Sequence, residues 1–446
     1  MDPKSLSINQ LSKAYLDGSL RPTTVTRMYL DSIKPDFSYR LVTERRALEQ
    51  ASRAEENFRA GITTGPLQGI PIALKDLMDT KGDVTSAGSR VLANRPPAAQ
   101  DCPAAARLEV AGAVFLGKTN MTELAFSGVG INPHFGTPGN ALNAALIPGG
   151  SSSGSGVAVA GKAACAAIGS DTGGSVRIPA AFNGIVGLKV TDKLLPTVGV
   201  VPLSTTLDTL GPMTRTVADA WTVLLALSAR VPEELEQVDR PMTLLVPTTI
   251  LLEDLDPVVE RAFAGLCESL TNAGHTLEYR AVPLLKEVGK LYNQYGNFAS
   301  HEALAVHGDL IASSGELMDP RVTKRILEAK DRQATEYIRL TLDRAPLIRE
   351  FWQNCKNYDA VLSPTVPILP PPIIELQDEE RYFEVNQLCL RNTSIFNFYS
   401  GPAVSVPIEH GLPVGAMIAT APNQERLAIQ IGMEVERLHT SGKSVD

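Results

Sequence analysis

Short apolar runs separated by turn-rich segments fill residues 67 to 227, and this texture constrains the fold more than any other feature. The apolar runs lie at 70–74, 114–116 and 185–188, and Gly, Ser, Asn and Pro are frequent between them. Runs this short and apolar are typical of strands that are buried on both faces of a sheet. The pattern predicts an α/β fold in which a mixed central β-sheet is covered by helices on both faces.

Three segments are expected along the chain. Residues 1–66 space apolar positions among charged ones, which predicts two or three amphipathic helices that pack on the core or form a homodimer. Residues 67–230 form the core just described, and residues 231–446 continue the same α/β domain with a helical region that shapes a pocket. The elements expected in the last segment are strands at 243–246, 276–279 and 359–362, closing strands at 396–408 and 414–420, a helix opening at Asp256, and one long surface helix from Asp319 to about residue 349.

Composition narrows the classes of function. Hydrophobic residues make up 44% of the chain, charged residues make up 20%, and the net charge is −8. These values are ordinary for a soluble protein and give no indication of nucleic acid or a membrane surface as a partner. The N-terminus lacks a signal-peptide pattern and no apolar stretch reaches about 18 residues, so we expect a cytoplasmic protein.

The cysteines give no indication of metal or disulfide chemistry. Their number is odd, they lie far apart, and no C-x-x-C pair occurs. They are Cys102, Cys165, Cys267, Cys355 and Cys389. We expect buried, reduced thiols, no metal and no cofactor.

A run of glycine and serine from 149 to 156 leads directly into an Ala-rich segment. Taken alone, such a run is typical of a flexible linker. A linker needs no Ala-rich segment after it, whereas small residues let a helix pack closely and serines at its start can cap free N–H groups. We therefore interpret the run as a fixed, buried loop before a core helix.

The sequence Asp171-Thr172-Gly173-Gly174-Ser175 follows soon after and forms a second unusual loop. Two glycines before a serine allow a tight turn in which backbone N–H groups converge and can bind an anion. Such a nest can hold the oxyanion of a tetrahedral intermediate, which makes Ser175 a candidate nucleophile for acyl transfer. Considered in isolation, the same five residues are also compatible with an ordinary turn.

A serine nucleophile needs a base, and the six histidines lie in no recognisable catalytic setting. A lysine can serve instead when burial keeps its amine neutral near pH 7. Lys75 ends the apolar run that starts at Gly69, so a buried strand would carry it inward. Lys118 follows a similar run, and local sequence alone does not separate the two lysines.

Four motifs, in this order, resemble those of the amidase signature family. They are Gly69-Ile-Pro-Ile-Ala-Leu-Lys-Asp76, Gly117-Lys-Thr-Asn-Met-Thr-Glu123, Gly149-Gly-Ser-Ser-Ser-Gly154 and Asp171-Thr-Gly-Gly-Ser-Val-Arg177. The likeness is strong from about residue 69 to 227 and thinner elsewhere. Ser153 stands where the family more often has glycine, and Val190 stands where it usually has proline.

The resemblance implies a catalytic triad of Ser175, Ser151 and Lys75. Ser175 would attack the amide carbonyl, and the spacing of 24 positions between the two serines agrees with the family. Ser151, on a cis peptide bond after Gly150, would relay a proton from Ser175 to neutral Lys75 and then to the leaving amine. Ser151 is distinguished from its two serine neighbours by the resemblance alone.

The resemblance also implies roles for residues around the triad. Backbone N–H groups of Thr172, Gly173, Gly174 and Ser175 would form the oxyanion hole. Ala125 would contribute to substrate binding, and Asp171 and Arg177 would brace the turn. The pocket walls are expected from residues 121–130 and from the stretch between about 285 and 350.

Two further motif matches are weaker. Residues 150–154 satisfy the G-x-S-x-G elbow of α/β-hydrolases, which would make Ser152 the nucleophile of an esterase, but the residues before them make a poor strand. Residues 156–163 nearly match a P-loop, but Ala163 replaces the Ser or Thr that would bind magnesium. We discard nucleotide binding and keep the elbow as an alternative.

The function that fits best is an amidohydrolase that cleaves a small-molecule carboxylic amide to a carboxylate and ammonia or an amine. A rival within the family is the amidase-like subunit of a tRNA-dependent amidotransferase, which shares the triad. The acidic net charge and the lack of a basic RNA-binding stretch weigh against that rival. A scaffold with a dead site would lack a triad residue, and all three are present.

Overall fold

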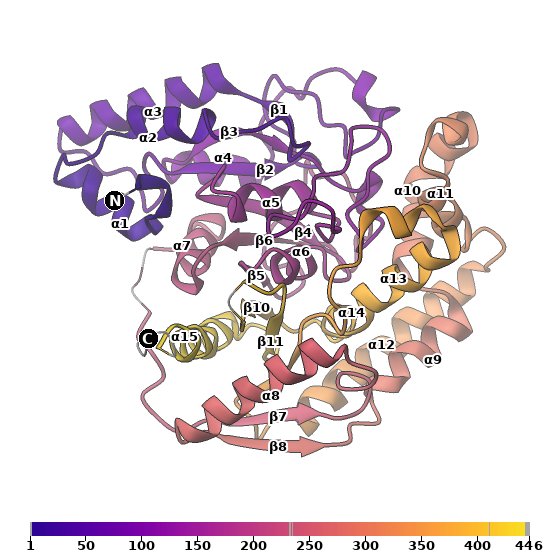
Figure 1. Ribbon diagram of the computed structural model, residues 1–446. Helices are drawn as coiled ribbons and strands as arrows, with labels where there is room; N and C mark the ends of the chain where they lie inside the picture. The colour runs from indigo at the N-terminus through magenta and orange to yellow at the C-terminus, as the bar shows by residue number, and fades with distance from the viewer. Residues whose placement is uncertain (1, 232, 234, 410, 442–446) are drawn as a thin grey trace.

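The molecule is built around one sheet of 11 strands (Figure 1). The computed structural model describes residues 2–231, 233, 235–409 and 411–441 of the chain. The strand order across the sheet is β1-β3-β2-β4-β6-β5-β10-β11-β9-β7-β8. The strands are β1 Tyr39–Val42, β2 Pro71–Lys75, β3 Val114–Thr119, β4 Ala166–Asp171, β5 Val186–Lys189, β6 Thr209–Thr214, β7 Thr243–Pro247, β8 Thr276–Arg280, β9 Ala360–Pro364, β10 Ala403–Pro407 and β11 Gly415–Ala419.

The sheet mixes parallel and antiparallel pairs, which confirms the predicted mixed α/β fold. β2 lies parallel to both β3 and β4, and β7 lies parallel to both β8 and β9. The strands between these two groups run antiparallel to their neighbours. Because β2 and β4 are parallel neighbours, their carboxyl ends, Lys75 and Asp171, meet at the same edge of the sheet.

Helices cover both faces of the central strands. Every residue of β2, β4 and β6 is buried, and successive side chains in a strand point to opposite faces. Helix α7 Val217–Leu227 contacts α4 Pro103–Val110 and α15 Glu425–Ser441, and α5 Ser153–Ala160 contacts α6 Arg177–Phe182. The helices α9 Leu285–Tyr295, α10 Phe298–Ser314, α13 Glu379–Arg391 and α14 Thr393–Phe398 gather at the end of the molecule away from the N-terminal helices (Figure 1).

The N-terminal segment forms the expected helices α1 Ile8–Leu16, α2 Pro22–Leu30 and α3 Glu44–Arg59, and the last two contact β3. It also supplies β1, which the sequence analysis does not predict. Three of the four residues of β1 are exposed and the strand lies at the edge of the sheet. An edge strand that faces solvent lacks the apolar run by which buried strands are recognised.

Two expected elements of the C-terminal half differ in the structure. The single long helix from Asp319 is two helices, α11 Pro320–Leu327 and α12 Ala334–Asn354. Helix α12 begins anew because Gln333 and Glu336 form a capping box that satisfies its first N–H groups. The strand expected over 396–408 begins as the end of α14, and only its second half forms β10.

The Gly/Ser run is buried as predicted, but only residues 149–152 form a loop, because α5 begins within the run at Ser153. Residues 153–159 of α5 are all buried. Gly154 has no room for a side chain, because a Cβ there would lie 2.1 Å from the carbonyl oxygen of Ser38 and 2.6 Å from the nitrogen of Asn120. This close approach joins the start of α5 to the segments before β1 and after β3.

Helix α8 Pro257–Asn272 opens at Asp256, whose side chain accepts the N–H of Val258 at 2.8 Å. All five cysteines are buried and free of disulfides, as expected. Among the described residues, no helix is both long and apolar enough to cross a membrane.

Candidate active site

Ser151 lies in a buried loop that backbone hydrogen bonds fix in place. The peptide bond between Gly150 and Ser151 is cis. The N–H of Gly150 donates to the carbonyl of Gly128 at 2.8 Å, and the N–H of Thr122 donates to the carbonyl of Ser151 at 3.1 Å. Neither contact uses the Ser151 hydroxyl, which is therefore available to other side chains.

Lys75 contacts that hydroxyl directly. Its Nζ lies 2.7 Å from Ser151 Oγ and 2.8 Å from Ser170 Oγ, and the side chain is fully buried. Burial lowers the pKa of Lys75 from 10.5 to about 7, although the nearby negative charges of Asp208 and Asp171 act in the opposite direction. A lysine in this state is half neutral near pH 7 and can accept a proton.

The structure also separates the two lysines that the sequence leaves equivalent. Lys118 Nζ lies 3.4 Å from a carboxylate oxygen of Asp76, 2.8 Å from Thr85 Oγ1 and 3.1 Å from the carbonyl of Val84. The contacts with a buried carboxylate, a hydroxyl and a carbonyl hold Lys118 in place and favour a structural role for it. Lys75 is the lysine that contacts Ser151.

A buried ion pair holds the turn that carries Ser175. The guanidinium of Arg177 donates to both carboxylate oxygens of Asp171, at 3.0 and 2.9 Å, and Asn397 Nδ2 donates to Asp171 Oδ1 at 2.8 Å. Burial alone would raise the pKa of Asp171, but Arg177 and these hydrogen bonds lower it to about 2. The two residues that were expected to brace the turn do contact each other.

Three backbone N–H groups in this turn have no partner among the described residues: those of Thr172, Gly173 and Ser175. The N–H of Gly174 differs, because it donates to Asp171 Oδ1 at 2.8 Å. Gly174 was expected in the oxyanion hole, but its N–H is already engaged, and Gly174 does not line the cavity beside Ser175. Of the four N–H groups expected in the oxyanion hole, the other three are without a partner in the described part of the chain.

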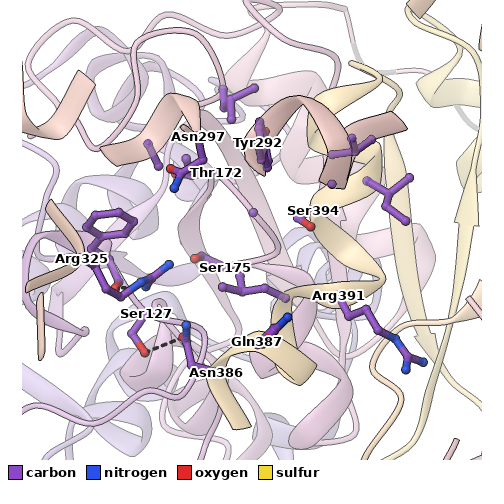
Figure 2. A pocket seen from close by; sticks show the side chains of 18 of the residues that line it. Ser127, Thr172, Ser175, Tyr292, Asn297, Arg325, Asn386, Gln387, Arg391 and Ser394 are labelled. Carbon is purple, nitrogen blue, oxygen red and sulfur yellow. Dashed lines mark hydrogen bonds between the residues drawn. The ribbon is translucent and has the colours of Figure 1, made fainter. Parts of the chain in front are cut away.

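Ser175 lies at the floor of a cavity of about 630 Å³ (Figure 2). Thr172, Gly173 and Ala125 line the same cavity, whereas Lys75 and Ser151 are not among its lining residues. Ala125 has a left-handed backbone with φ of 59°, and Leu124 before it has φ of 49°. This conformation is uncommon for residues other than glycine, and it turns the chain so that Ala125 reaches the cavity wall.

The cavity walls extend beyond the segments that the sequence predicts. Residues 125–127 and side chains from α9, α10 and α11 line it as expected. Helices α13 and α14 also contribute and were not expected, with Asn386, Gln387, Leu390, Arg391, Ser394 and Ile395. These residues lie more than 200 positions from Ser175 in sequence, so only the folded chain shows their proximity.

The Ser151 and Ser175 hydroxyls are not hydrogen-bonded to each other in this structure, as far as the described residues show. The two loops are joined through the backbone, since the N–H of Ser152 donates to the carbonyl of Ser175 at 3.2 Å. Catalytic hydrogen bonds often tighten only when substrate binds. No cluster of three or more His, Cys, Asp or Glu side chains that could hold a metal occurs in the described ranges.

Ser170 is a neighbour of Lys75 that the sequence analysis misses. If its hydroxyl orients the lysine amine, Ser170→Ala lowers kcat by about 10- to 100-fold and leaves KM nearly unchanged. Ser170→Thr, which keeps a hydroxyl, restores most of the rate. Steady-state kinetics across pH 5 to 9 checks this, because loss of an orienting contact to the lysine moves the midpoint of the profile, whereas a general loss of stability does not.

A model of the family described as Amidase matches residues 24–429, which is most of the chain. The chain belongs to the amidase family. This amidase is 34% identical over 413 residues to the 2-amino-5-chloromuconic acid deaminase of Comamonas testosteroni, covering 90% of the chain and 88% of that protein. It is 29% identical over 461 residues to a glutamyl-tRNA(Gln) amidotransferase subunit from Clostridium acetobutylicum, covering 94% of the chain and 96% of that relative.

Solved structures agree with the assignment of the fold. A crystal structure titled as that of an amidase superposes with a TM-score of 0.88 at 30% identity, covering 97% of this chain and 99% of the other. The amidase described here is accordingly a hydrolase that acts on C–N bonds, and its relatives include both deaminase and amidotransferase proteins.

Proposed function

We propose that this amidase hydrolyses a small-molecule carboxylic amide through an acyl-enzyme on Ser175. The observation that carries the proposal is the contact between the fully buried Lys75 Nζ and Ser151 Oγ, 2.7 Å apart, in a loop that is hydrogen-bonded to Ser175, which lines the cavity. A neutral amine held at this position is a base that needs neither histidine nor metal.

In the proposed reaction, Ser175 Oγ attacks the amide carbon as its proton passes to Ser151 Oγ, whose own proton passes to Lys75 Nζ. The carbonyl oxygen becomes an oxyanion that accepts hydrogen bonds from the N–H groups of Thr172, Gly173 and Ser175. The C–N bond then breaks, and the leaving nitrogen takes a proton from Ser151, which Lys75 replenishes. Water adds to the acyl-enzyme by the same proton path and releases the carboxylate.

Ser152 is the nucleophile in the alternative esterase hypothesis, and its surroundings do not favour that role. Its hydroxyl is fully buried, donates to the carbonyl of Ser170 at 3.3 Å, and does not line the cavity. We expect Ser152→Ala to keep amide hydrolysis within about tenfold of the wild-type rate, because no bond is made or broken at this residue. An inactive Ser152→Ala protein together with an active Ser175→Ala protein would establish the elbow instead.

The first experiment asks which serine reacts and with what. The purified protein is treated with a fluorophosphonate, and the labelled peptide is identified by mass spectrometry; label on the peptide that contains Ser175 supports the proposal, and label on another serine contradicts it. Aliphatic amides, aryl amides, ureas and amino-acid amides are then compared for release of ammonia or amine.

The amidotransferase hypothesis is supported by the similarity to proteins of that name, and the same panel separates it from the proposal. Such a protein would need partner subunits for its complete reaction, whereas an amidohydrolase turns over small amides as the single purified chain. The net charge of −8 weighs against binding of tRNA by this chain. Turnover of glutamine that rises only when amidotransferase partners and tRNA are added would favour the rival.

A further inference from the structure

A cation faces the cavity without a carboxylate partner in the described part of the chain. Arg325, from α11, lines the cavity and has no carboxylate oxygen within 4.0 Å among the described residues. Its guanidinium lies 4.2 Å from the centre of the Phe126 ring and donates to the carbonyl of Phe126. One of five N–H donors is thus engaged within the described part of the chain, and the other four can donate to a ligand. Arg391 also lines the cavity, but its guanidinium points away from Ser175 (Figure 2).

Arg325 also differs from the arginines that are paired with carboxylates nearby. Arg321, one turn earlier on α11, is paired with Asp319 at 2.8 Å, and Arg177 behind the cavity is paired with Asp171. Burial lowers the pKa of Arg325, although Tyr382 and the carboxylate of Glu328 act in the opposite direction, and a guanidinium remains protonated in proteins. Glu328 is exposed and is not within ion-pair distance, so a partly buried guanidinium here would be stabilised by a carboxylate that a ligand supplies.

Asn386, from α13, presents a second donor on the same side. Its Oδ1 accepts the backbone N–H of Gly128 at 2.9 Å and the hydroxyl of Ser127 at 3.0 Å. A backbone N–H can only donate, so the amide must turn its oxygen to Gly128 and its nitrogen away. Asn386 Nδ2 has no partner among the described residues, and Figure 2 shows Asn386, Ser127 and Arg325 together on one side of Ser175.

We propose that the substrate carries a carboxylate in addition to its amide, and that Arg325 and Asn386 bind this carboxylate. A planar guanidinium with a neighbouring amide donor matches the two oxygens of a carboxylate. The inference rests on the proposed amide hydrolysis and adds the chemical class of the substrate.

The remainder of the cavity limits what joins the two groups. Six apolar side chains also line it: Leu203, Leu207, Ile250, Leu285, Val288 and Leu390. The one carboxylate among the described lining residues, Glu328, is exposed, so the cavity offers no buried partner for an ammonium group. The monoamide of a dicarboxylic acid with a hydrocarbon body therefore fits this cavity better than an amino-acid amide does.

The kinetic test compares monoamides of linear dicarboxylic acids with alkanamides of the same chain length. Wild-type protein should have a kcat/KM at least about 100-fold higher for the acids, because each of two charge-assisted contacts adds to binding. Arg325→Gln should remove most of this preference, because it should lower kcat/KM for the monoamides of dicarboxylic acids. It should change kcat/KM for the alkanamides less than about threefold. Arg325→Lys, which keeps the charge, should retain part of the preference.

Arg339→Gln serves as the matched control, because Arg339 lies exposed on α12 and does not line the cavity. Its replacement by glutamine removes the same charge as Arg325→Gln does. It should leave the preference intact. Two outcomes overturn the inference and leave the proposed amide hydrolysis in place. One is that Arg325→Gln lowers kcat/KM equally for the monoamides of dicarboxylic acids and for the alkanamides. The other is that the wild-type protein shows no preference for those monoamides.

A second measurement does not depend on finding a good substrate. Linear dicarboxylates should slow the labelling of Ser175 by the fluorophosphonate in the wild type, whereas diols of the same length should not. This protection should disappear in Arg325→Gln. Labelling of Ser175 that dicarboxylates do not slow contradicts the carboxylate site alone, whereas absence of labelling at Ser175 contradicts the proposed function itself.

Discussion

Replacing Ser175 by alanine is expected to abolish amide hydrolysis, lowering kcat by about 10⁴-fold or more. The change removes the atom that would form the acyl-enzyme, and the rest of the cavity stays in place. Ser175 is buried but its hydroxyl opens to the cavity, so alanine fits without rearrangement. Ammonia release from the best amide of the panel measures the loss.

Folding and substrate binding provide the controls for this result. Ser175→Ala should unfold at the wild-type temperature within a few degrees and should still bind the substrate, because the Asp171–Arg177 pair that holds the turn is unchanged. Ser152→Ala is the matched serine variant and should remain active. Retention of a tenth or more of wild-type kcat in Ser175→Ala would rule out this serine as the nucleophile.

Replacing Lys75 by methionine is expected to lower kcat by about 10³- to 10⁴-fold and to remove its dependence on pH near neutrality. Methionine keeps the length of the side chain but offers no base. In the wild type, the rate should rise with pH through about 7 and then level off, because Lys75 acts in its neutral form and its pKa is about 7. A profile for kcat from pH 5 to 9 checks both statements.

The same substitution should stabilise the protein. Lys75 has a pKa of about 7 when folded and 10.5 when unfolded, so between these values the unfolded chain binds more protons and stability rises with pH. Burying the charged Lys75 thus lowers the free energy of unfolding by about 5 kcal/mol. The full amount applies below pH 7, and it decreases to zero as the pH rises to 10.5. Thermal melts should show the gain of Lys75→Met at pH 7 shrinking as the pH approaches 10.5; a constant gain contradicts the assignment.

Much of the fold could be predicted because buried strands leave a clear local pattern. Each of the three apolar runs places apolar side chains on both faces of its strand. The runs are residues 70–74, 114–116 and 185–188, and they form β2, β3 and β5. Two elements did not follow from local pattern. β1 is exposed, so it has no apolar run, and the break between α11 and α12 depends on a capping box that a charged, helix-favouring stretch conceals.

The candidate site was predictable to the extent that its residues lie in short motifs. Lys75, Ser151 and Ser175 each stand in such a motif, although local physics alone supports only Ser175. Ser170 and Asn386 could not be found in this way. The first contacts Lys75 across neighbouring strands, and the second reaches the cavity from a helix more than 200 residues after the nucleophile, so tertiary packing alone brings them there.

Reaction chemistry and substrate choice are encoded in separable parts of this chain. In the proposed reaction, the strand ends and loops between 75 and 175 hold the reacting groups, whereas most residues that line the cavity come from helices between 285 and 395. Gene libraries that randomise only the wall positions on α9, α11, α13 and α14 could therefore retarget the enzyme to new amides without disturbing the proton path. Such a division offers protein engineers, and natural selection, a way to change the substrate while keeping the same chemistry.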